Sequence, residues 1–322
     1  MTERRPILLL IDVEPDDRKT TPADDGWKSS EVALDHLERL RGELESATRS
    51  PVRFNWFLRG DPQITQTWGR ADWVAEACPR IVKAIERHED HAGAHVHLWR
   101  LDAKRGEWYN DFRDPAWAER CLDEGIAAHR AIFGSAPESC RWGDRWLSRA
   151  AVEMLREKGI RYDLTVEPGL PGGGVHDDPG AIGSLPDFRG APREPWQPAP
   201  WNYLEHSATP GGFWMIPLTT TAPSLRLVRR APWLMVASRS PNLSLSSSYV
   251  WPHLRKELDR PAHTPLVFVF RSGDLAKRKF LRNFETTTGL LARHPALAYC
   301  DFTIVPDAVS RWRATGAADA PR

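Results

Sequence analysis

Short apolar runs alternate along the chain with longer segments whose apolar residues recur at helical spacing. A run of successive apolar residues is typical of a parallel strand buried on both faces, whereas a stripe at every third or fourth residue indicates an amphipathic helix. The runs predict seven or eight strands, at 6–13, 52–57, 93–98, 139–142, 162–166, 213–218, 266–270 and 298–305. The stripes predict helices at 30–47, 73–88, 115–133, 148–158 and about 276–293.

Strands that alternate with helices in this way predict an α/β protein with a parallel sheet. Both a βα barrel and an open, doubly wound sheet satisfy the pattern. The first strand is not followed by GxGxxG or GxxxxGK[ST], so dinucleotide-binding and P-loop proteins lose their main support. The segment 167–212 breaks the pattern because it is dense in Pro and Gly, and we expect either a surface excursion or a loop that lines a substrate site. The last residues, 314–322, are predicted to form a disordered tail.

Composition narrows the class of protein. The chain has 322 residues, 41% of them hydrophobic and 27% charged, which suits one large α/β domain or two smaller ones. Its formal net charge of +1 lacks the basic excess of proteins that bind nucleic acid or anionic membranes, so we expect neither partner. No apolar run approaches the ~20 residues that cross a bilayer or forms a signal-peptide core, so a cytoplasmic location is expected. The four cysteines contain no CxxC pair and are predicted to be reduced thiols.

Polar side chains occur where the first and third predicted strands end. Asp12 and Glu14 are two residues apart on the first strand, and His95 and His97 have the same spacing on the third. Residues two apart on a strand share a face, so each pair can point into one site. Two histidines and a carboxylate form a familiar ligand set for a divalent metal that keeps one position open for water. The alternative is that this HxH spacing arose by chance and that both imidazoles serve structure. Amidohydrolase barrels carry HxH on the first strand, so the order of elements argues against that family.

An ordered series of segments resembles the polysaccharide deacetylases, the NodB-homology fold of carbohydrate esterase family 4. Ile11-Asp12-Val13-Glu14 resembles the acid motif of one branch of the family, and Asp90 to Trp99 is similar to its histidine motif. Cys140 to Trp146 looks like the branch's F-R-A-G-R-W segment. Later similarities lie at 159–163, 188–196, 214–219 and 267–275. The resemblance covers about residues 6 to 305, and it implies a distorted (β/α)7-type barrel and a single catalytic domain over 1–313.

The family's chemistry implies roles for particular residues of this chain. Asp12 would be the general base or a metal partner, Arg141 would orient it, and Glu14, His95 and His97 would hold a divalent metal. Zinc is the expected ion, with cobalt or nickel as alternatives. The implied activity is a hydrolase of non-peptide C–N bonds that removes an N-acyl group from a glycan or another sugar-like small molecule, with metal-activated water as nucleophile.

Two departures from the family pattern leave other functions open. Trp99 stands where the usual HxxxH would place the second histidine, so His97 must substitute for it. Arg271 stands where the family has the late histidine that protonates the leaving amine, and arginine stays protonated near neutral pH. Arg271 could bind an anion instead. His176 or His206 of the long loop could supply the acid, or the protein could be a non-catalytic ligand-binding member of the fold or a metal-independent C–N hydrolase.

The chain contains 15 tryptophans, far more than an average protein of this length. Some are predicted to fill the core, as Trp56, Trp73 and Trp117 would. Others fall near the ends of strands or in the long loop, where an indole can stack on a sugar ring. The predicted substrate-binding residues are Trp99, Trp142, Asp144, Arg145, Trp146 and Trp196, with Trp201 as a further rim candidate. The alternatives are that these indoles pack in a bulky core and that Asp144 and Arg145 form a surface ion pair.

Overall fold

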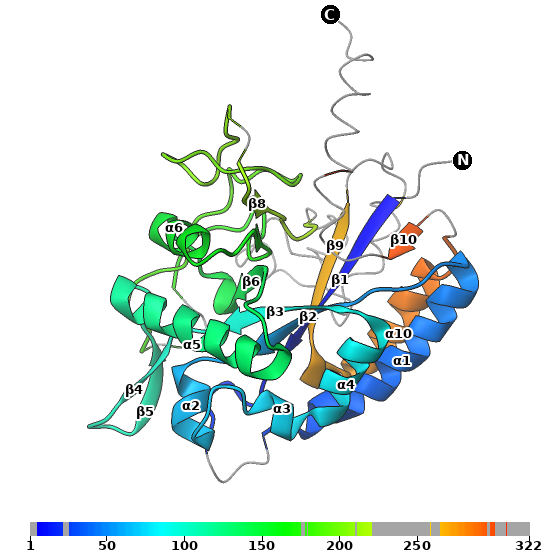
Figure 1. The fold of residues 1–322 in the computed structure, drawn as a ribbon, viewed down its shortest axis with the longest axis horizontal. Helices are drawn as coiled ribbons and strands as arrows, with labels where there is room; N and C mark the ends of the chain where they lie inside the picture. Colours follow the sequence, from blue (N-terminus) through cyan, green and yellow to red (C-terminus); the bar gives the residue numbers. More distant parts are fainter. Residues whose placement is uncertain are drawn as a thin grey trace, which may run out of the picture.

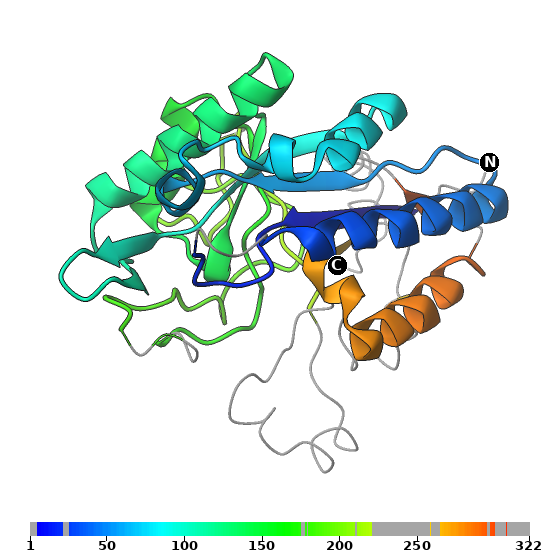
Figure 2. The same ribbon diagram turned by 90° about the horizontal axis from the view of Figure 1, so that it is seen from below.

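The computed structural model describes residues 5–21, 26–174, 178, 180–209, 211–220, 258, 265–294, 297–299 and 307. The predicted tail, His176 and most of the strand predicted at 298–305 lie outside these residues. The predicted barrel is confirmed in the described part, where a curled parallel sheet carries helices on its outside (Figures 1 and 2). Figure 1 shows helices α1 (Lys28–Thr48), α4 (Pro79–His88) and α10 (Arg278–Leu291) around one half of the curled sheet and α5 (Pro115–Phe133) and α6 (Arg149–Glu157) around the other.

Seven strands form the curl, in the order β9, β1, β2, β3, β6, β7, β8, and all neighbours are parallel. The chain after β8 returns to the first strand of this series, because the Thr219 backbone N–H donates to the Val267 carbonyl at 3.0 Å. An eighth strand, β10, pairs with the start of β1. The bounds are β1 Arg5–Val13, β2 Asn55–Arg59, β3 His91–Val96, β6 Ser139–Trp142, β7 Tyr162–Asp163, β8 Trp214–Met215, β9 Leu266–Arg271 and β10 Leu297–Tyr299.

The helices follow the predicted pattern with two differences. The helix predicted at 73–88 is divided at Cys78, because the ring of Pro79 disfavours a helical conformation in the residue before it. A short helix, α2, and a hairpin of strands β4 and β5 were not predicted, and the hairpin projects from the body in Figure 1. The bounds are α1 Lys28–Thr48, α2 Pro62–Trp68, α3 Val74–Ala77, α4 Pro79–His88, β4 Trp99–Asp102, β5 Glu107–Asn110, α5 Pro115–Phe133, α6 Arg149–Glu157 and α10 Arg278–Leu291. None of the described helices is long and apolar enough to cross a membrane.

Alternate residues of the strands face the two sides of the curled sheet. On β1, Ile7, Leu9 and Ile11 pack in the cluster that includes residues of α1, α4 and α10, whereas Leu8 and Leu10 belong to a separate cluster inside the curl. The interior cluster consists of Leu8, Leu10, Phe57, Tyr162, Leu164, Ile216, Leu218, Val267 and Val269. The interior of the barrel is therefore a packed apolar layer, and the next inward-facing residues toward the carboxyl ends lie at its mouth.

The described part of the long loop is packed against the body. Trp196 is 0% exposed, and its backbone exchanges hydrogen bonds with Met215 of β8, at 3.0 Å from Trp196 N and 2.8 Å from Met215 N. Phe188 is also buried, in the apolar cluster that includes residues of α5 and α6. Through these contacts the loop forms part of the apolar core around β8.

Candidate metal centre

The carboxyl ends of the parallel strands bring the predicted ligands to one place, the mouth of the barrel. Asp12 at the end of β1 is in register with Arg271 of β9, and His95 of β3 is in register with Arg141 of β6. His95 is also in register with Arg59 of β2. Because each of these positions continues the inward-facing stripe of its strand, their side chains converge above the apolar interior.

Glu14, His95 and His97 place three donor atoms around one position. The two Nε2 atoms of His95 and His97 are 3.1 Å apart, and Glu14 carboxylate oxygens lie 3.2 Å from His97 Nε2 and 3.6 Å from His95 Nε2. All three residues are buried, and they form a candidate metal-ligand group among the described residues. Ligands at about 2.0–2.1 Å from a tetrahedral zinc ion lie roughly 3.3 Å from one another. The separations therefore suit one small divalent cation with its remaining position open.

Each imidazole can present its Nε2 to a metal. His95 Nδ1 lies 2.8 Å from the carbonyl oxygen of Arg141, which can only accept, so Nδ1 carries the proton. His97 Nδ1 lies 3.1 Å from a carboxylate oxygen of Asp144. In His95 the lone pair is consequently on Nε2. In His97 both nitrogens face a carboxylate, since Nε2 lies 3.2 Å from Glu14, and metal binding at the triad requires the proton on Nδ1. The donor set present in this chain fits a divalent metal.

The charges around the triad favour the ligand forms. Burial alone would raise the pKa of Glu14, but Arg271 and His97 outweigh it and hold that pKa well below its ordinary value. Burial, reinforced by the nearby Arg59, holds the pKa of His97 well below its ordinary value. Near neutral pH the site therefore offers a charged carboxylate and a neutral imidazole, which are the forms that bind metals.

Asp12 lies beside the triad with its carboxylate fixed by Arg141. Arg141 Nε is 3.0 Å from both oxygens of Asp12, and its Nη1 donates to the carbonyl of Leu164 at 2.8 Å. Burial would lower the pKa of Arg141, but Asp12 and Glu167 outweigh it, so that pKa is raised. Arg141 thus remains a cation, and it neutralises the buried carboxylate and fixes the direction of its lone pairs.

The arrangement of strands and helices matches known structures over almost the whole chain. A Mycobacterium smegmatis protein assigned as a polysaccharide deacetylase aligns with a TM-score of 0.52 at 12% identity, covering 97% of this chain and 92% of its own. A Parabacteroides distasonis protein assigned as a glycoside hydrolase or deacetylase aligns with a TM-score of 0.56 at 14% identity, covering 97% and 72%. This chain has the NodB-homology fold. No protein-family model and no curated protein matches the sequence.

Within this NodB-homology barrel, Arg271 points toward the candidate metal ligands. Its Nε lies 2.8 Å from Glu14 Oε1, its Nη2 donates to the Pro15 carbonyl at 3.2 Å, and its side chain is 33% exposed. Glu14 is the first cause of the raised pKa of Arg271, so the residue stays charged and supplies no proton. Arg271 therefore pairs with the candidate ligand Glu14 through its Nε.

Two residues of the site were not found from the sequence. Arg59 is fully buried, donates from Nε to Asp61 at 2.9 Å, and holds Nη1 3.6 Å from Glu14 Oε2. Asp61 also accepts from the His97 backbone N–H at 3.0 Å, and it caps α2 through the backbone N–H groups of Gln63 and Ile64. The sequence did contain one signal for Asp61. An aspartate followed by proline, directly after a buried strand, is typical of the start of a helix.

The predicted substrate-binding tryptophans are buried. Trp142 is on the face of β6 opposite to Arg141, and it packs edge-on against Trp146 with ring centroids 5.0 Å apart. Trp146 stacks on Phe112, and Trp99 lies under the guanidinium of Arg18, 5.7 Å from the ring centroid. Together with the buried Trp196, these positions favour the alternative of a bulky core, and stacking on a substrate stays a prediction. Trp201, at 64% exposure, is the one rim candidate that presents its ring to solvent.

Asp144 and Arg145 do not form the surface ion pair that was considered as an alternative. Asp144 is largely buried and contacts His97 and Arg18. Arg145 has a buried Nη1 without a hydrogen-bond partner among the described residues. Burial raises the pKa of Glu167, and Arg141 and Arg145 partly offset this. Arg145 therefore belongs to the charges around the mouth, although no contact with a substrate is shown.

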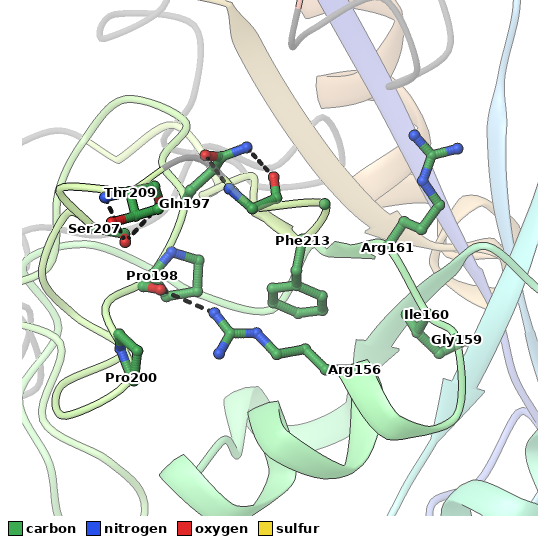
Figure 3. A pocket seen from close by; sticks show the side chains of 12 residues that line it. Arg156, Gly159, Ile160, Arg161, Gln197, Pro198, Pro200, Ser207, Thr209 and Phe213 are labelled. Carbon is green, nitrogen blue, oxygen red and sulfur yellow. Dashed lines mark hydrogen bonds between the residues drawn. The ribbon is translucent and has the colours of Figure 1, made fainter.

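A cavity elsewhere in the molecule contains none of the predicted site residues. It has a volume of about 610 Å³ and lies between the end of α6, the amino end of β7 and the loop up to Phe213 (Figure 3). Arg156 crosses it, with its guanidinium 5.3 Å from the Phe213 ring centroid and a hydrogen bond to the Pro198 carbonyl. Because the metal centre is at the carboxyl ends of the strands, this cavity is not its substrate pocket.

Proposed function

We propose that this protein is a metal-dependent hydrolase that removes an N-acyl group from a glycan or another sugar-like small substrate. The observation that carries the proposal is the convergence of Glu14, His95 and His97 beside a carboxylate, Asp12, that Arg141 orients. Nitrogen and carboxylate ligands around one open position suit zinc, with cobalt or nickel as substitutes. The fold shared with proteins assigned as deacetylases supports an amide-hydrolysing reaction.

The chain's own residues divide the chemistry between them. A bound divalent ion would polarise the acyl carbonyl and make a water molecule acidic near neutral pH. Asp12 accepts the proton of the attacking water at a carboxylate oxygen, and Arg141 keeps that oxygen oriented and the group charged. Arg271 cannot donate to the leaving amine, so among the described residues of the site the protonated Asp12 is the group that can return the proton to nitrogen.

Metal binding is the first test. Protein stripped with a chelator should regain metal with zinc, cobalt or nickel, and a ligand present at 1,000 times its dissociation constant stabilises the fold by about 4 kcal/mol. Variants His95→Ala and His97→Ala should lose both the bound metal and the thermal shift. His88→Ala is a matched control, because that histidine is on α4 and pairs with Glu38 away from the site. Wild-type protein that binds none of the three ions and shows no shift contradicts the proposal.

A second candidate function is ligand binding without catalysis, and the observation that favours it is the ion pair between Arg271 and Glu14. Release of acetate from N-acetylated sugars separates the two candidates. Wild-type turnover that is lost in Asp12→Asn supports the hydrolase. Sugar binding without turnover, together with deacetylase activity gained by Arg271→His, supports a repurposed site. Turnover that survives the double change His95→Ala and His97→Ala would indicate a metal-independent hydrolase.

A further inference from the structure

Asp144 joins a candidate metal ligand to a residue far away in the sequence. One of its carboxylate oxygens, Oδ2, lies 3.1 Å from His97 Nδ1, and the other, Oδ1, accepts a hydrogen bond from Arg18 Nη2. Arg18 is in the loop that follows β1, only four residues after Glu14. The loops after β1 and β6 are thereby connected through the side chain that supports His97.

The backbone around Asp144 is shaped for this contact. Asp144 and Arg145 both have φ of 52°, in the left-handed region that residues other than glycine adopt rarely. Gly143 lies directly against the imidazole, since a Cβ atom placed there would be 2.2 Å from His97 Nε2. Unusual backbone of this kind persists only where surrounding contacts fix it, and it concentrates at functional sites.

Arg18 is itself held in place from two directions. Its carbonyl oxygen accepts from Gln63 Nε2 at 3.0 Å, and Gln63 belongs to α2, the helix that Asp61 caps. Its guanidinium lies over the buried ring of Trp99. The contact between Arg18 and Asp144 is therefore set by the same packing that positions the end of β2.

The partner of His97 differs in charge from the partner of His95. His95 Nδ1 faces a neutral carbonyl, that of Arg141, whereas His97 Nδ1 faces a carboxylate. A carboxylate fixes the proton on Nδ1 more strongly and makes the opposite nitrogen a better metal ligand. Glu14 faces Nε2 of the same ring at 3.2 Å, but Arg271 and Arg59 share its carboxylate. The His97 backbone N–H is bound by Asp61 as well, so the ring is constrained at both its backbone and its Nδ1 edge.

We propose that Asp144, held by Arg18, is a positioning residue that keeps the proton of His97 on Nδ1 and directs the Nε2 lone pair toward Glu14 and His95. This replaces the substrate contact that the sequence predicted for Asp144. The orientation of the ring is a property of the metal-free protein, and only its consequence for metal affinity rests on the proposed function.

The tautomer of His97 tests the proposal without any metal. Long-range ¹H–¹⁵N spectra of the imidazoles, recorded on chelator-treated protein at a pH where the ring is neutral, distinguish a proton on Nδ1 from one on Nε2. The wild type should show mainly the Nδ1–H form, and Asp144→Ala should shift the ring to the Nε2–H form, in which Glu14 accepts the proton. A wild-type ring protonated on Nε2, or the same tautomer in wild type and variant, overturns the proposal.

Zinc affinity measured in competition with a chromophoric chelator is the second readout. Asp144→Ala should weaken binding by about 10- to 100-fold, the usual effect of removing the partner of a ligating histidine. Asp144→Asn should have a smaller effect because its amide oxygen can still accept from Nδ1–H, and this variant serves if the alanine variant does not fold. Arg18→Met should weaken binding less than Asp144→Ala.

Asp72→Ala is the matched control, since Asp72 pairs with Arg70 at the surface. If both Asp144 variants bind zinc as tightly as wild type while His97→Ala abolishes binding, the positioning role is overturned. If wild-type protein binds no zinc, the proposed function fails, and the spectra still decide whether Asp144 fixes the tautomer.

Discussion

The interior of the barrel and its mouth are built from the same stripes of residues and have opposite chemistry. On β1 the inward-facing residues are Leu8 and Leu10 in the interior, followed by Asp12 at the mouth and Glu14 just beyond it. On β9 the apolar Val267 and Val269 are followed in the same way by Arg271. The change from apolar to charged occurs within one step of the alternation on both strands.

This difference shows how the fold separates stability from chemistry. The apolar layer stabilises the barrel by removing side chains from water, without a need for specific partners. Each buried charge at the mouth carries a desolvation penalty and requires a counter-charge, as Asp12 finds in Arg141. We therefore expect changes in the two layers to have separable effects, on unfolding free energy in the interior and on metal binding and turnover at the mouth.

The largest expected effect is on turnover, at the mouth. Asp12→Asn keeps the shape of the side chain and an oxygen for Arg141 but removes the base, so kcat should fall by about 10²- to 10⁴-fold. Zinc affinity should change little, because the candidate ligands remain. Steady-state rates of acetate release, together with chelator competition, measure the two quantities. An equal loss of metal affinity would show that Asp12 is a ligand, and the separation of base from ligands would have to be abandoned.

The buried indoles near the mouth should behave like the interior. Trp196→Ala removes a fully buried ring and should lower the unfolding free energy by about 3–5 kcal/mol. Trp201→Ala removes an exposed ring and should change it by no more than about 0.5 kcal/mol. Urea denaturation of both variants measures the difference. A stable Trp196→Ala protein with strongly weakened sugar binding would restore the prediction that this ring contacts substrate.

Much of the fold was predictable because strongly periodic segments decide it locally. The helix predicted at 115–133 is found as Pro115–Phe133, with its N-cap at Asp114 and left-handed Gly134 at its end. The strand predicted at 139–142 is also found without change. Helix α2 was not predicted because seven residues are too few to show a helical period of apolar residues. The break at Cys78 shows that one proline can interrupt a helix even where the apolar stripe is continuous.

The site was predictable only where spacing along one strand carries the information. Asp12 with Glu14, and His95 with His97, follow from residues two apart sharing a face. Arg59 has its role only through contacts between strands, which no local pattern reveals. On the four-residue strand β6, alternation turns Arg141 inward and Trp142 out toward the helices, so two predicted site residues that are adjacent in the sequence face opposite sides of the sheet.

A substitution in the interior tests whether stability can be lowered without a change in metal binding. Leu10→Ala should lower the unfolding free energy by about 2–5 kcal/mol, since it removes a fully buried side chain from a closed apolar layer. Zinc affinity should stay within about twofold of wild type, because the inward-facing ligands are on later residues of the strands. Urea denaturation and chelator competition on the same sample check both statements. A large loss of affinity would mean that the interior packing, and not the local hydrogen bonds, positions the ligands.

The smallest effect concerns Asp163 of β7, a fully buried carboxyl in register with Cys140 and Met215, on the face of the sheet opposite to the interior layer. Burial raises the pKa of Asp163 to about 7, and its hydrogen bonds to the backbone and hydroxyl of Thr165 offset the effect only in part. Because this folded pKa is above the unfolded one, the native state binds the proton more tightly. The resulting stability is fully present below the unfolded pKa and is lost as pH rises through about 7.

Asp163→Asn carries no charge at any pH, so it should gain stability relative to wild type as pH rises from 4 to 8, by at most about 1.4 kcal/mol per pH unit. Denaturant titrations across that range measure the difference. Asp187→Asn is the control, because Arg189 lowers the pKa of Asp187 to about 2 and its difference from wild type should be flat above pH 5. If the Asp163→Asn difference were flat as well, the carboxyl would be ionised throughout and Arg141 would neutralise it as it does Asp12. A buried charge would then exist on the outer face of the sheet, and the separation of apolar from charged residues seen on β1 and β9 would not extend to β7.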